Sequence, residues 1–217
     1  MRKGVCHGEP QRVSELSGVP GVSLYRPGVS EINNETIHER QTLRNHIAVR
    51  KGGAMIAIPQ IQEKMIGFLR GNLHDISHFI NVWTYAKLIG ELEHLDPETQ
   101  YILEVAAVVH DIACPLCREK YGNTDGKNQE RESDPLVREF LSEADLTEDQ
   151  IDRVAFLVSH HHTLTGIEGA DYQILIEADY IVNAAENGYS RENIENFISK
   201  VMRTESGKRI TAAVFGI

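Results

Sequence analysis

The stretch Glu104-Val105-Ala106-Ala107-Val108-Val109-His110-Asp111 decides the fold of this chain, because a run of small and branched apolar residues ends in a His-Asp pair. The run is apolar on every face of a helix, which predicts a helix enclosed by other helices. His110 and Asp111 are therefore expected near the middle of the fold. Polar side chains in that position need partners, and both of these types can bind a metal ion.

Length and composition limit what this pair can belong to. The chain has 217 residues, of which 41% are hydrophobic and 25% are charged, and this predicts one globular domain with a substantial core. No apolar run approaches the ~20 residues that cross a bilayer, and the first residues lack the apolar stretch of a secretory signal. Three cysteines are too few for a disulfide framework. We therefore expect a cytoplasmic protein with no membrane partner.

The net charge narrows the range of partners. A formal charge of -10 repels the phosphate backbone of nucleic acids, so a nucleic-acid duplex is not expected as a partner. A small phosphorylated substrate can still bind through a metal ion and a few local cations. Oligomeric state is left open by the sequence.

The first 54 residues differ from the rest in composition. They hold eight Lys and Arg, five Glu, seven glycines and three prolines, a formal charge of +3 that leaves -13 for the remainder. This predicts a poorly structured N-terminal extension over 1–54 and a helical domain over 55–217. The stretch from Arg50 to Met55 is also what a purine-rich ribosome-binding sequence would encode, so Met55 is an alternative start. The other interpretation is a genuine N-terminal arm.

From Met55 onward the apolar spacing is helical, which indicates an all-α, compact multi-helix bundle. We expect helices near 58–69 and 75–93, and a third that begins after an Asp96 cap with Pro97 in its first turn. A loop over 114–126 is expected to form a wall of the active site. Further helices are expected near 128–144, with a break or restart at Pro135, after a Thr147–Gln150 capping box, near 172–187, and after a Ser190 cap.

Helical periodicity turns metal-capable side chains inward from three helices. His78 shares a face with Val82 and Ile89, and Asp179 shares a face with Leu175 and Val182. Taken alone, a buried histidine is more often a hydrogen-bonded core residue than a metal ligand, and an aspartate is more often a helix cap. Together with His110 and Asp111, they suit a divalent ion (manganese, iron, cobalt, nickel, zinc or magnesium) with coordination positions left for water and substrate.

The order of these motifs resembles that of the HD-domain metal-dependent phosphohydrolase superfamily over about residues 70–187. The resemblance rests on His78, the His110-Asp111 pair and Asp179, with His74-Asp75-Ile76-Ser77-His78 opening one helix and Glu177-Ala178-Asp179 in a late one. It implies an all-helical fold and a divalent metal held by His78, His110, Asp111 and Asp179. It also implies hydrolysis of phosphate esters, often in nucleotides. His74 is not assigned as a ligand; we expect it at the start of the helix or beside the metal ligands.

Of the run His160-His161-His162, periodicity selects His161 as the inward residue, and its neighbours are expected to be exposed or outside the ligand set. The resemblance implies a histidine near the metal at this point. His161 is therefore a candidate for contacting phosphate, protonating the leaving oxygen or helping to bind a second metal. Relatives with two metals carry a further histidine after the His-Asp pair. Residues 126–130 contain none, so one metal is expected.

The expected chemistry is attack of a metal-activated water on phosphorus, since a bound divalent ion lowers the pKa of its water from ~15.7 toward ~7. Asp111 is the candidate for orienting that water. Arg118, Lys120 and Lys127 are candidates for the substrate phosphate, and the alternative for each is a solvated loop of mixed charge.

Cys114 and Cys117 have thioredoxin-like spacing, but the strand-to-helix junction of a redox motif is not predicted here. Zinc binding would need another ligand pair. We expect two small, half-buried loop cysteines whose oxidation could disturb the adjacent metal site.

The sequence thus predicts a metal-dependent phosphohydrolase acting on a nucleotide or another phosphomonoester. The alternative is a metal-containing ligand-binding or regulatory module with little turnover. No glycine-rich phosphate loop or base-stacking pattern identifies the substrate.

Overall fold

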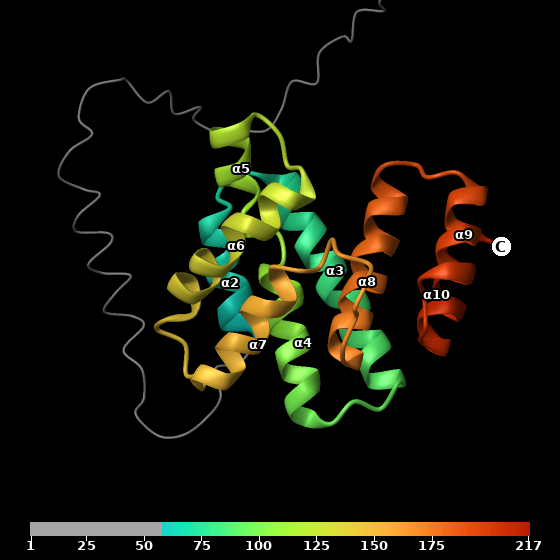
Figure 1. Ribbon diagram of the computed structural model, residues 1–217, viewed down its shortest axis with the longest axis horizontal. Coiled ribbons are helices and arrows are strands. Elements are labelled where there is room, and N and C mark those ends of the chain that lie inside the picture. The colour runs from blue at the N-terminus through green and yellow to red at the C-terminus, as the bar shows by residue number, and fades with distance from the viewer. Residues whose placement is uncertain (1–57) are drawn as a thin grey trace, which may run out of the picture. The chain divides into compact units, whose positions relative to one another are not determined.

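The structure is a computed structural model that describes residues 58–217, and helix is the only regular secondary structure within that range (Figure 1). The predicted irregular extension over 1–54 and the alternative start at Met55 lie outside the described residues. The helices are α2 (Ile58–Phe68), α3 (Leu73–Leu92), α4 (Pro97–Val109), α5 (Cys114–Tyr121), α6 (Gly126–Leu141), α7 (Glu148–Val158), α8 (Ala170–Glu186), α9 (Arg191–Lys200) and α10 (Glu205–Phe215).

Helix α4 lies at the centre of the bundle. It packs against α2, α3, α7 and α8, and the side chains from Val105 to Val109 have no exposed surface. Helix α3 in turn packs along α8, while α9 and α10 flank these two on one side (Figure 1). The prediction that the apolar run forms an enclosed helix is confirmed. The His-Asp pair thus directly follows a fully buried stretch of the core.

Three predicted helix starts are confirmed by their caps. The Asp96 carboxylate accepts hydrogen bonds from the backbone N–H groups of Glu98 and Thr99 at 3.1 Å each. Thr147 forms a reciprocal capping box with Gln150, and Ser190 caps α9. These bonds satisfy N–H groups that have no partner inside the helix and so fix where each helix begins.

The segment expected as a loop over 114–126 is instead mostly helix α5, so that expectation was wrong. Pro115 stands in the first turn of α5, and Gly122 ends it with a left-handed φ of 71°. These are start and stop signals for a short helix. Pro135 neither breaks nor restarts α6, because the helix is continuous and buries Val137, Phe140 and Leu141 against the bundle.

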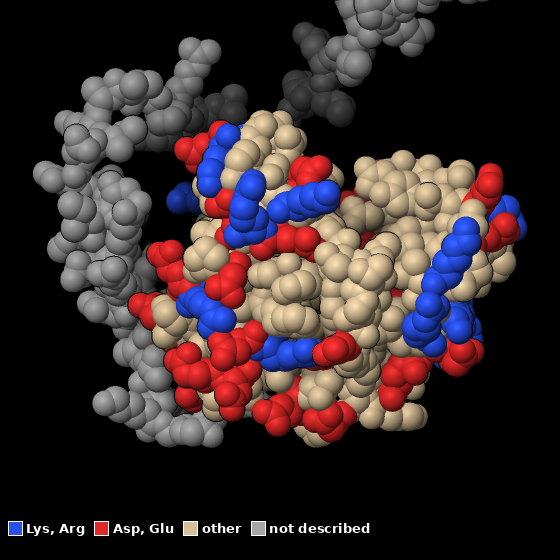
Figure 2. Space-filling view, viewed as in Figure 1, with Lys and Arg blue, Asp and Glu red and all other residues tan. Residues whose placement is uncertain are grey.

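The apolar stretch Pro97–Tyr121 is long enough and hydrophobic enough to cross a membrane by composition alone. However, 72% of its most apolar window is buried inside the protein, as in the core helix of a soluble bundle. On the face shown in Figure 2, Lys and Arg side chains lie beside Asp and Glu and do not form one continuous basic patch. The cytoplasmic location and the absence of a nucleic-acid partner stay predictions.

Candidate metal centre

The structure brings the four predicted metal ligands together. His78 Nε2 from α3 lies 3.2 Å from His110 Nε2 at the end of α4 and 3.2 Å from Asp179 Oδ1 of α8. Asp111 Oδ2 lies 3.6 Å from His78 Nε2 and 3.7 Å from His110 Nε2. Four atoms from three helices thus surround one small volume, although their role as ligands stays a prediction.

Each histidine of the centre is oriented by its other ring nitrogen. Nδ1 of His110 lies 2.9 Å from the carbonyl oxygen of Ala107, and Nδ1 of His161 lies 2.7 Å from that of Val158. Nδ1 of His78 lies 2.9 Å from Glu186 Oε2. Carbonyl and carboxylate oxygens only accept hydrogen bonds, so each Nδ1 carries a hydrogen, and whenever the ring is neutral Nε2 presents a lone pair to the centre.

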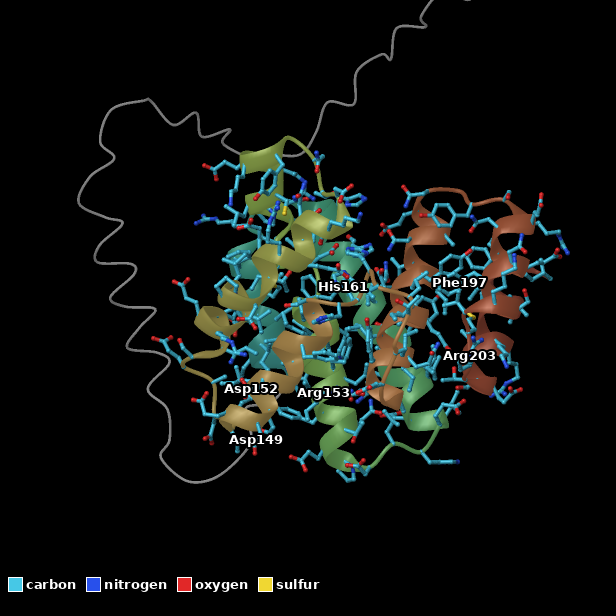
Figure 3. The ribbon with its side chains drawn as sticks, viewed as in Figure 1. Asp149, Asp152, Arg153, His161, Phe197 and Arg203 are labelled. Atoms are coloured by element: carbon cyan, nitrogen blue, oxygen red, sulfur yellow. The ribbon has the colours of Figure 1, made fainter. Side chains whose placement is uncertain are left out.

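When the histidines are neutral, the centre therefore holds only hydrogen-bond acceptors: the Nε2 atoms of the rings and the carboxylate oxygens of Asp111 and Asp179. His161 Nε2 is buried without a hydrogen-bond partner in the described structure, and it lies 3.7 Å from Asp111 Oδ1. Figure 3 shows His161 in the interior of the bundle, whereas Asp149 and Asp152 project outward from α7. Lone pairs and carboxylates this close repel one another unless a cation lies between them. The residues fit a divalent metal ion, since imidazole nitrogen and carboxylate oxygen are its ordinary ligands.

The pKa shifts of His78, Asp111 and Asp179 also indicate that a positive charge is favoured in the centre. Burial lowers the pKa of His78, but hydrogen bonding to Asp179 and the charges of Asp111 and Asp179 outweigh burial and raise it to about 9. Burial raises the pKa values of Asp111 and Asp179, yet the neighbouring histidines hold both well below the usual range of a carboxyl. Without a metal, a proton thus supplies the missing positive charge.

A second group of metal-capable atoms shares one residue with the first. Ligand atoms of Asp111, His161 and His162 lie within 4.8 Å of one another. His161 is 2% exposed, which confirms its inward orientation. His162 is exposed, as expected for a neighbour, but it also lines the cavity, which periodicity did not indicate. Helix α7 ends at Val158, so His161 and His162 lie on a turn, where adjacent side chains can point to the same side.

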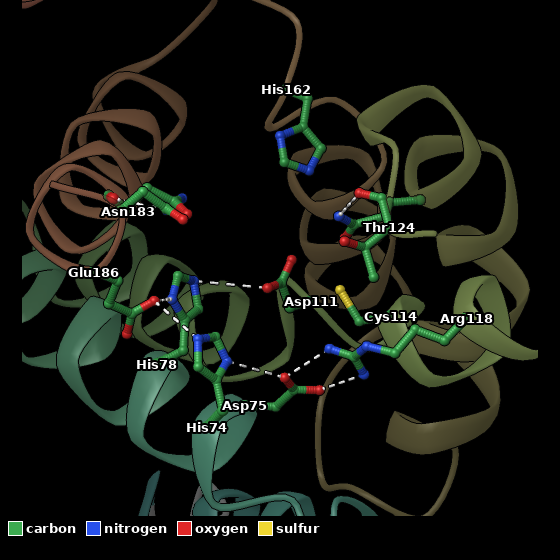
Figure 4. Close-up of a pocket in the computed structure, with 12 residues that line it drawn as sticks. His74, Asp75, His78, Asp111, Cys114, Arg118, Thr124, His162, Asn183 and Glu186 are labelled. Atoms are coloured by element: carbon green, nitrogen blue, oxygen red, sulfur yellow. Dashed lines mark hydrogen bonds and ion pairs between the residues drawn. The ribbon is translucent and has the colours of Figure 1, made fainter. Parts of the chain in front are cut away.

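The centre opens into a cavity of about 270 Å³ between the N-terminal part of α3, the C-terminal part of α8 and the segment from α5 to α6 (Figure 4). The lining residues are His74, Asp75, His78, Asp111, Cys114, Arg118, Thr124, Gln129, His162, Asn183, Glu186 and Asn187. Lys120 and Lys127 are not among them: Lys120 pairs with Glu132 at 2.9 Å, and Lys127 is exposed. Their predicted role in binding phosphate remains a prediction.

Arg118 does line the cavity, but its guanidinium is already engaged. It donates two hydrogen bonds of 2.7 Å to the carboxylate of Asp75, which joins α5 to α3 (Figure 4). A phosphate group would have to share Arg118 with this carboxylate. Sequence spacing gave no sign of the pair, because its partners are 43 residues apart.

Two residues near the end of α8 were also not assigned a role from the sequence. Asn183 Nδ2 donates to Asp179 Oδ1 at 2.7 Å, and Glu186 holds His78. Both follow Asp179 on the same helical face, at four and seven residues' distance. The sequence shows that these residues share a helical face with Asp179. It does not show that Glu186 contacts His78.

The two cysteines are buried in helix α5, so the expectation of half-buried loop cysteines was wrong. Cys114 and Cys117 are 3% and 0% exposed. Burial raises the pKa of both thiols, and for Cys114 the charge of Asp111 adds to the effect. A protonated, buried thiol is a poor nucleophile and a poor metal ligand.

Comparison with known proteins agrees with this site. The model of the HD domain family matches residues 75–201, a range that contains all four predicted ligands. A search of curated proteins found no match. A crystal structure of a predicted HD superfamily hydrolase from an uncultured Thermotogales bacterium has a similar fold, with a TM-score of 0.54 at 17% identity over 73% of this chain and 84% of that one.

The fold is thus an all-helical bundle, and it brings together a His/Asp cluster that suits a divalent metal ion. The chain belongs to the HD domain family.

Proposed function

We propose that this protein hydrolyses the phosphate ester of a small molecule with a metal-activated water. The observation that carries the proposal is the convergence of three Nε2 lone pairs on Asp111 and Asp179 at the floor of a cavity. These ligand atoms can bind one or more divalent ions and leave coordination positions free on the side that faces the cavity. Closed structural sites use four protein ligands around one ion and leave no room for substrate.

A bound divalent ion would supply hydroxide near neutral pH and would polarise a phosphoryl oxygen. The chain's own residues do the rest. His78, His110, Asp111 and Asp179 would hold the ion, and Asp111 would in addition accept a hydrogen bond from the attacking water and so orient it. Arg118 is the cation nearest to the substrate phosphate and, with Asp75, keeps α5 against α3.

The geometry favours a second ion beside the first. Asp111 directs Oδ2 toward His78 and His110 and directs Oδ1 toward His161. Asp111 would contribute to both sites, and His161 and His162 would hold the second ion. The expectation of a single metal rested on the absence of histidine from 126–130, and His162 offers a ligand that this expectation left out.

One experiment distinguishes hydrolysis from the alternative, a metal-containing binding or regulatory module with little turnover. The full chain is loaded with each divalent metal, its metal content is measured, and phosphate release is followed from nucleotides and phosphomonoesters. Phosphate release that depends on the metal supports hydrolysis. A metal-loaded protein that releases no phosphate from any of them supports binding alone.

The matched variants are Asp111→Ala and Asp149→Ala. Asp111 lies between the two groups of ligands, so its loss should remove both the metal and the activity. Asp149 projects from the surface of α7, and its loss should change neither (Figure 3). Full activity of Asp111→Ala would refute the assignment of the site.

A further inference from the structure

The lining of the cavity restricts what can occupy it. Its twelve residues are His, Asp, Cys, Arg, Thr, Gln, Asn and Glu, and no aliphatic residue and no Phe, Tyr or Trp of the described chain is among them. Pockets for nucleotides and drug-like ligands are lined mainly by apolar and aromatic side chains and measure ~300–1,000 Å³. Every side chain that lines this cavity carries a nitrogen, oxygen or sulfur atom, and its volume of about 270 Å³ lies near the lower end of that range.

The cavity offers little surface on which a nucleobase could stack. Its only rings in the described residues are imidazoles of His74, His78 and His162. His78 is held among the metal ligands, and the ring of His162 lies 3.9 Å from that of His161. The side chain of His74 is 72% exposed at the mouth, and one open imidazole is a weak platform compared with the aromatic pairs that hold bases.

The charge of the site sets a limit on the number of phosphates. Asp75, Asp111, Asp179 and Glu186 face one guanidinium, that of Arg118, which leaves a formal charge of -3. One divalent ion reduces this to -1, and two ions bring it to +1. A phosphomonoester of charge -2 can be held beside two ions, whereas a triphosphate would be repelled by the same carboxylates.

The walls instead present hydrogen-bonding groups that have no partner in the described structure. The side-chain oxygens of Asn183 and Asn187 accept no hydrogen bond there, and the hydroxyl of Thr124 makes none. Asn183 and Thr124 lie on opposite sides of the cavity (Figure 4). Amide oxygens accept from hydroxyl groups, and a threonine hydroxyl both donates and accepts.

We propose that the substrate is a small, hydroxyl-rich phosphomonoester, such as a sugar or polyol monophosphate, and that nucleotides are poor substrates. Hydroxyl groups on the leaving alcohol contact Asn183 and Asn187 on α8 and Thr124 across the cavity, while the phosphate lies over the ions. This inference rests on the proposed phosphate ester hydrolysis and names the substrate class for it.

The test measures kcat/KM of the full, metal-loaded chain for three sets of compounds: sugar and polyol monophosphates, nucleoside 5′-monophosphates, and nucleoside triphosphates. We expect kcat/KM for the best sugar or polyol phosphate to exceed that for every nucleotide at least tenfold. A nucleotide that matches or exceeds the sugar phosphates overturns this inference and leaves the proposed function standing. No phosphate release from any compound overturns the proposed function itself.

A pair of variants tests the hydroxyl contacts. Asn187→Ala should raise KM for the preferred sugar phosphate about fivefold, the value of one lost hydrogen bond, with a smaller change in kcat. Asn196→Ala on α9 lies away from the cavity lining and serves as the matched control, with KM unchanged. An unchanged KM in both variants would overturn the assigned contact at Asn187.

Discussion

At the scale of single residues, we expect the contact between Glu186 and His78 to influence how tightly the centre binds a metal ion. The 2.9 Å hydrogen bond fixes the hydrogen on Nδ1 of His78 and keeps Nε2 directed at Asp179. Loss of such an outer partner typically costs 10–100-fold in metal affinity. We predict a loss of that size in Glu186→Ala, measured by calorimetric titration with Mn²⁺ or Zn²⁺.

Two further variants show whether the loss of metal affinity comes from a misoriented His78 ring or only from the loss of a negative charge. Glu186→Gln keeps an oxygen that accepts from Nδ1 and should recover most of the affinity. Glu195→Ala removes an exposed carboxylate of α9 that pairs with Arg191, and it should have no effect. Equal affinity of Glu186→Ala and the wild-type protein would show that His78 is held by other contacts.

Protonation of His78 predicts how metal affinity depends on pH. The pKa of His78 is about 9 in the metal-free protein, so below pH 9 an entering ion must displace a proton. Affinity should rise with pH by up to ~tenfold per unit and level off above pH 9. Calorimetric titration in buffers of different ionisation enthalpy at pH 7 would measure about one proton released per ion at this position. Release of no proton would contradict the prediction.

The same shift affects the stability of the metal-free protein. The pKa of His78 is raised above its ordinary 6.5, so protonation stabilises the folded state fully below pH 6.5, and this contribution disappears as the pH rises through 9. Unfolding by urea in the presence of a chelator should therefore require less denaturant at pH 9.5 than at pH 6.5.

The inward orientation of the candidate ligands could be predicted from sequence where they lie within helices. His78 and Asp179 stand at fixed positions of long periodic segments, so their inward orientation followed from spacing alone. His162 could not be found in this way, because it lies on a turn beyond the end of α7. The pairing of Arg118 with Asp75 was equally hidden, since it depends on how α5 packs against α3.

At the scale of elements, α8 holds the turn that carries His161 and His162. The hydroxyl of Tyr172 lies 2.6 Å from the carbonyl oxygen of His160 and 2.8 Å from that of Thr163. Tyr172→Phe leaves these buried carbonyls without a donor, which costs about 1–3 kcal/mol of unfolding free energy. We predict that it also lowers the affinity for a second metal ion, measured by titration of Mn²⁺ stoichiometry.

Tyr180→Phe is the matched control, because Tyr180 lies on the same helix and its hydroxyl donates to the surface residue Asn193. It should leave both the metal stoichiometry and the affinity unchanged. If Tyr172→Phe lowers only the unfolding temperature and binds metal as the wild-type protein does, Tyr172 has no role in positioning the turn.

Helix α10 was not predicted, and its N-terminus shows why. The buried carboxylate of Glu177 on α8 accepts hydrogen bonds from the backbone N–H groups of Arg203 and Thr204 and from the Thr204 hydroxyl. Glu93, the residue after α3, accepts from the backbone N–H of Ser206 in the same turn. The start of α10 thus combines a local cap, in which the Thr204 hydroxyl accepts from the backbone N–H of Gly207, with carboxylates from α8 and from the residue after α3. Local sequence patterns do not reveal the two carboxylates.

Glu177→Ala should therefore loosen α10 before the rest of the bundle. Hydrogen bonds to a buried charge contribute ~1.5–3 kcal/mol each, so we expect a loss of about 3 kcal/mol in unfolding free energy. Hydrogen exchange of the amides over 205–215 should accelerate most. Uniform acceleration across α3, α4 and α8 as well would show that α10 unfolds together with the core.

At the scale of the whole molecule, the helical class and the central position of α4 followed from the sequence because they depend on burial alone. Apolar periodicity and caps at Asp96, Thr147 and Ser190 are local signals, and the structure follows them closely. Helix α5 was missed because it has only eight residues, although Pro115 in its first turn and Gly122 at its end are local signals for the two ends of a helix.

The metal centre also joins parts of the chain that are distant in sequence. Its predicted ligands come from α3, α4, α8 and the turn after α7, and they include two carboxylates that repel each other when no cation is present. A ligand that binds only the folded state at ~100 times its Kd stabilises that state by about 2.7 kcal/mol. For a domain of this size, chelation should therefore lower the midpoint of thermal unfolding by about 5–10 °C. Asp111→Asn should melt at the same temperature with and without chelator, because it no longer retains the ion. If chelation leaves the wild-type midpoint unchanged, the clustered lone pairs are satisfied by protons alone.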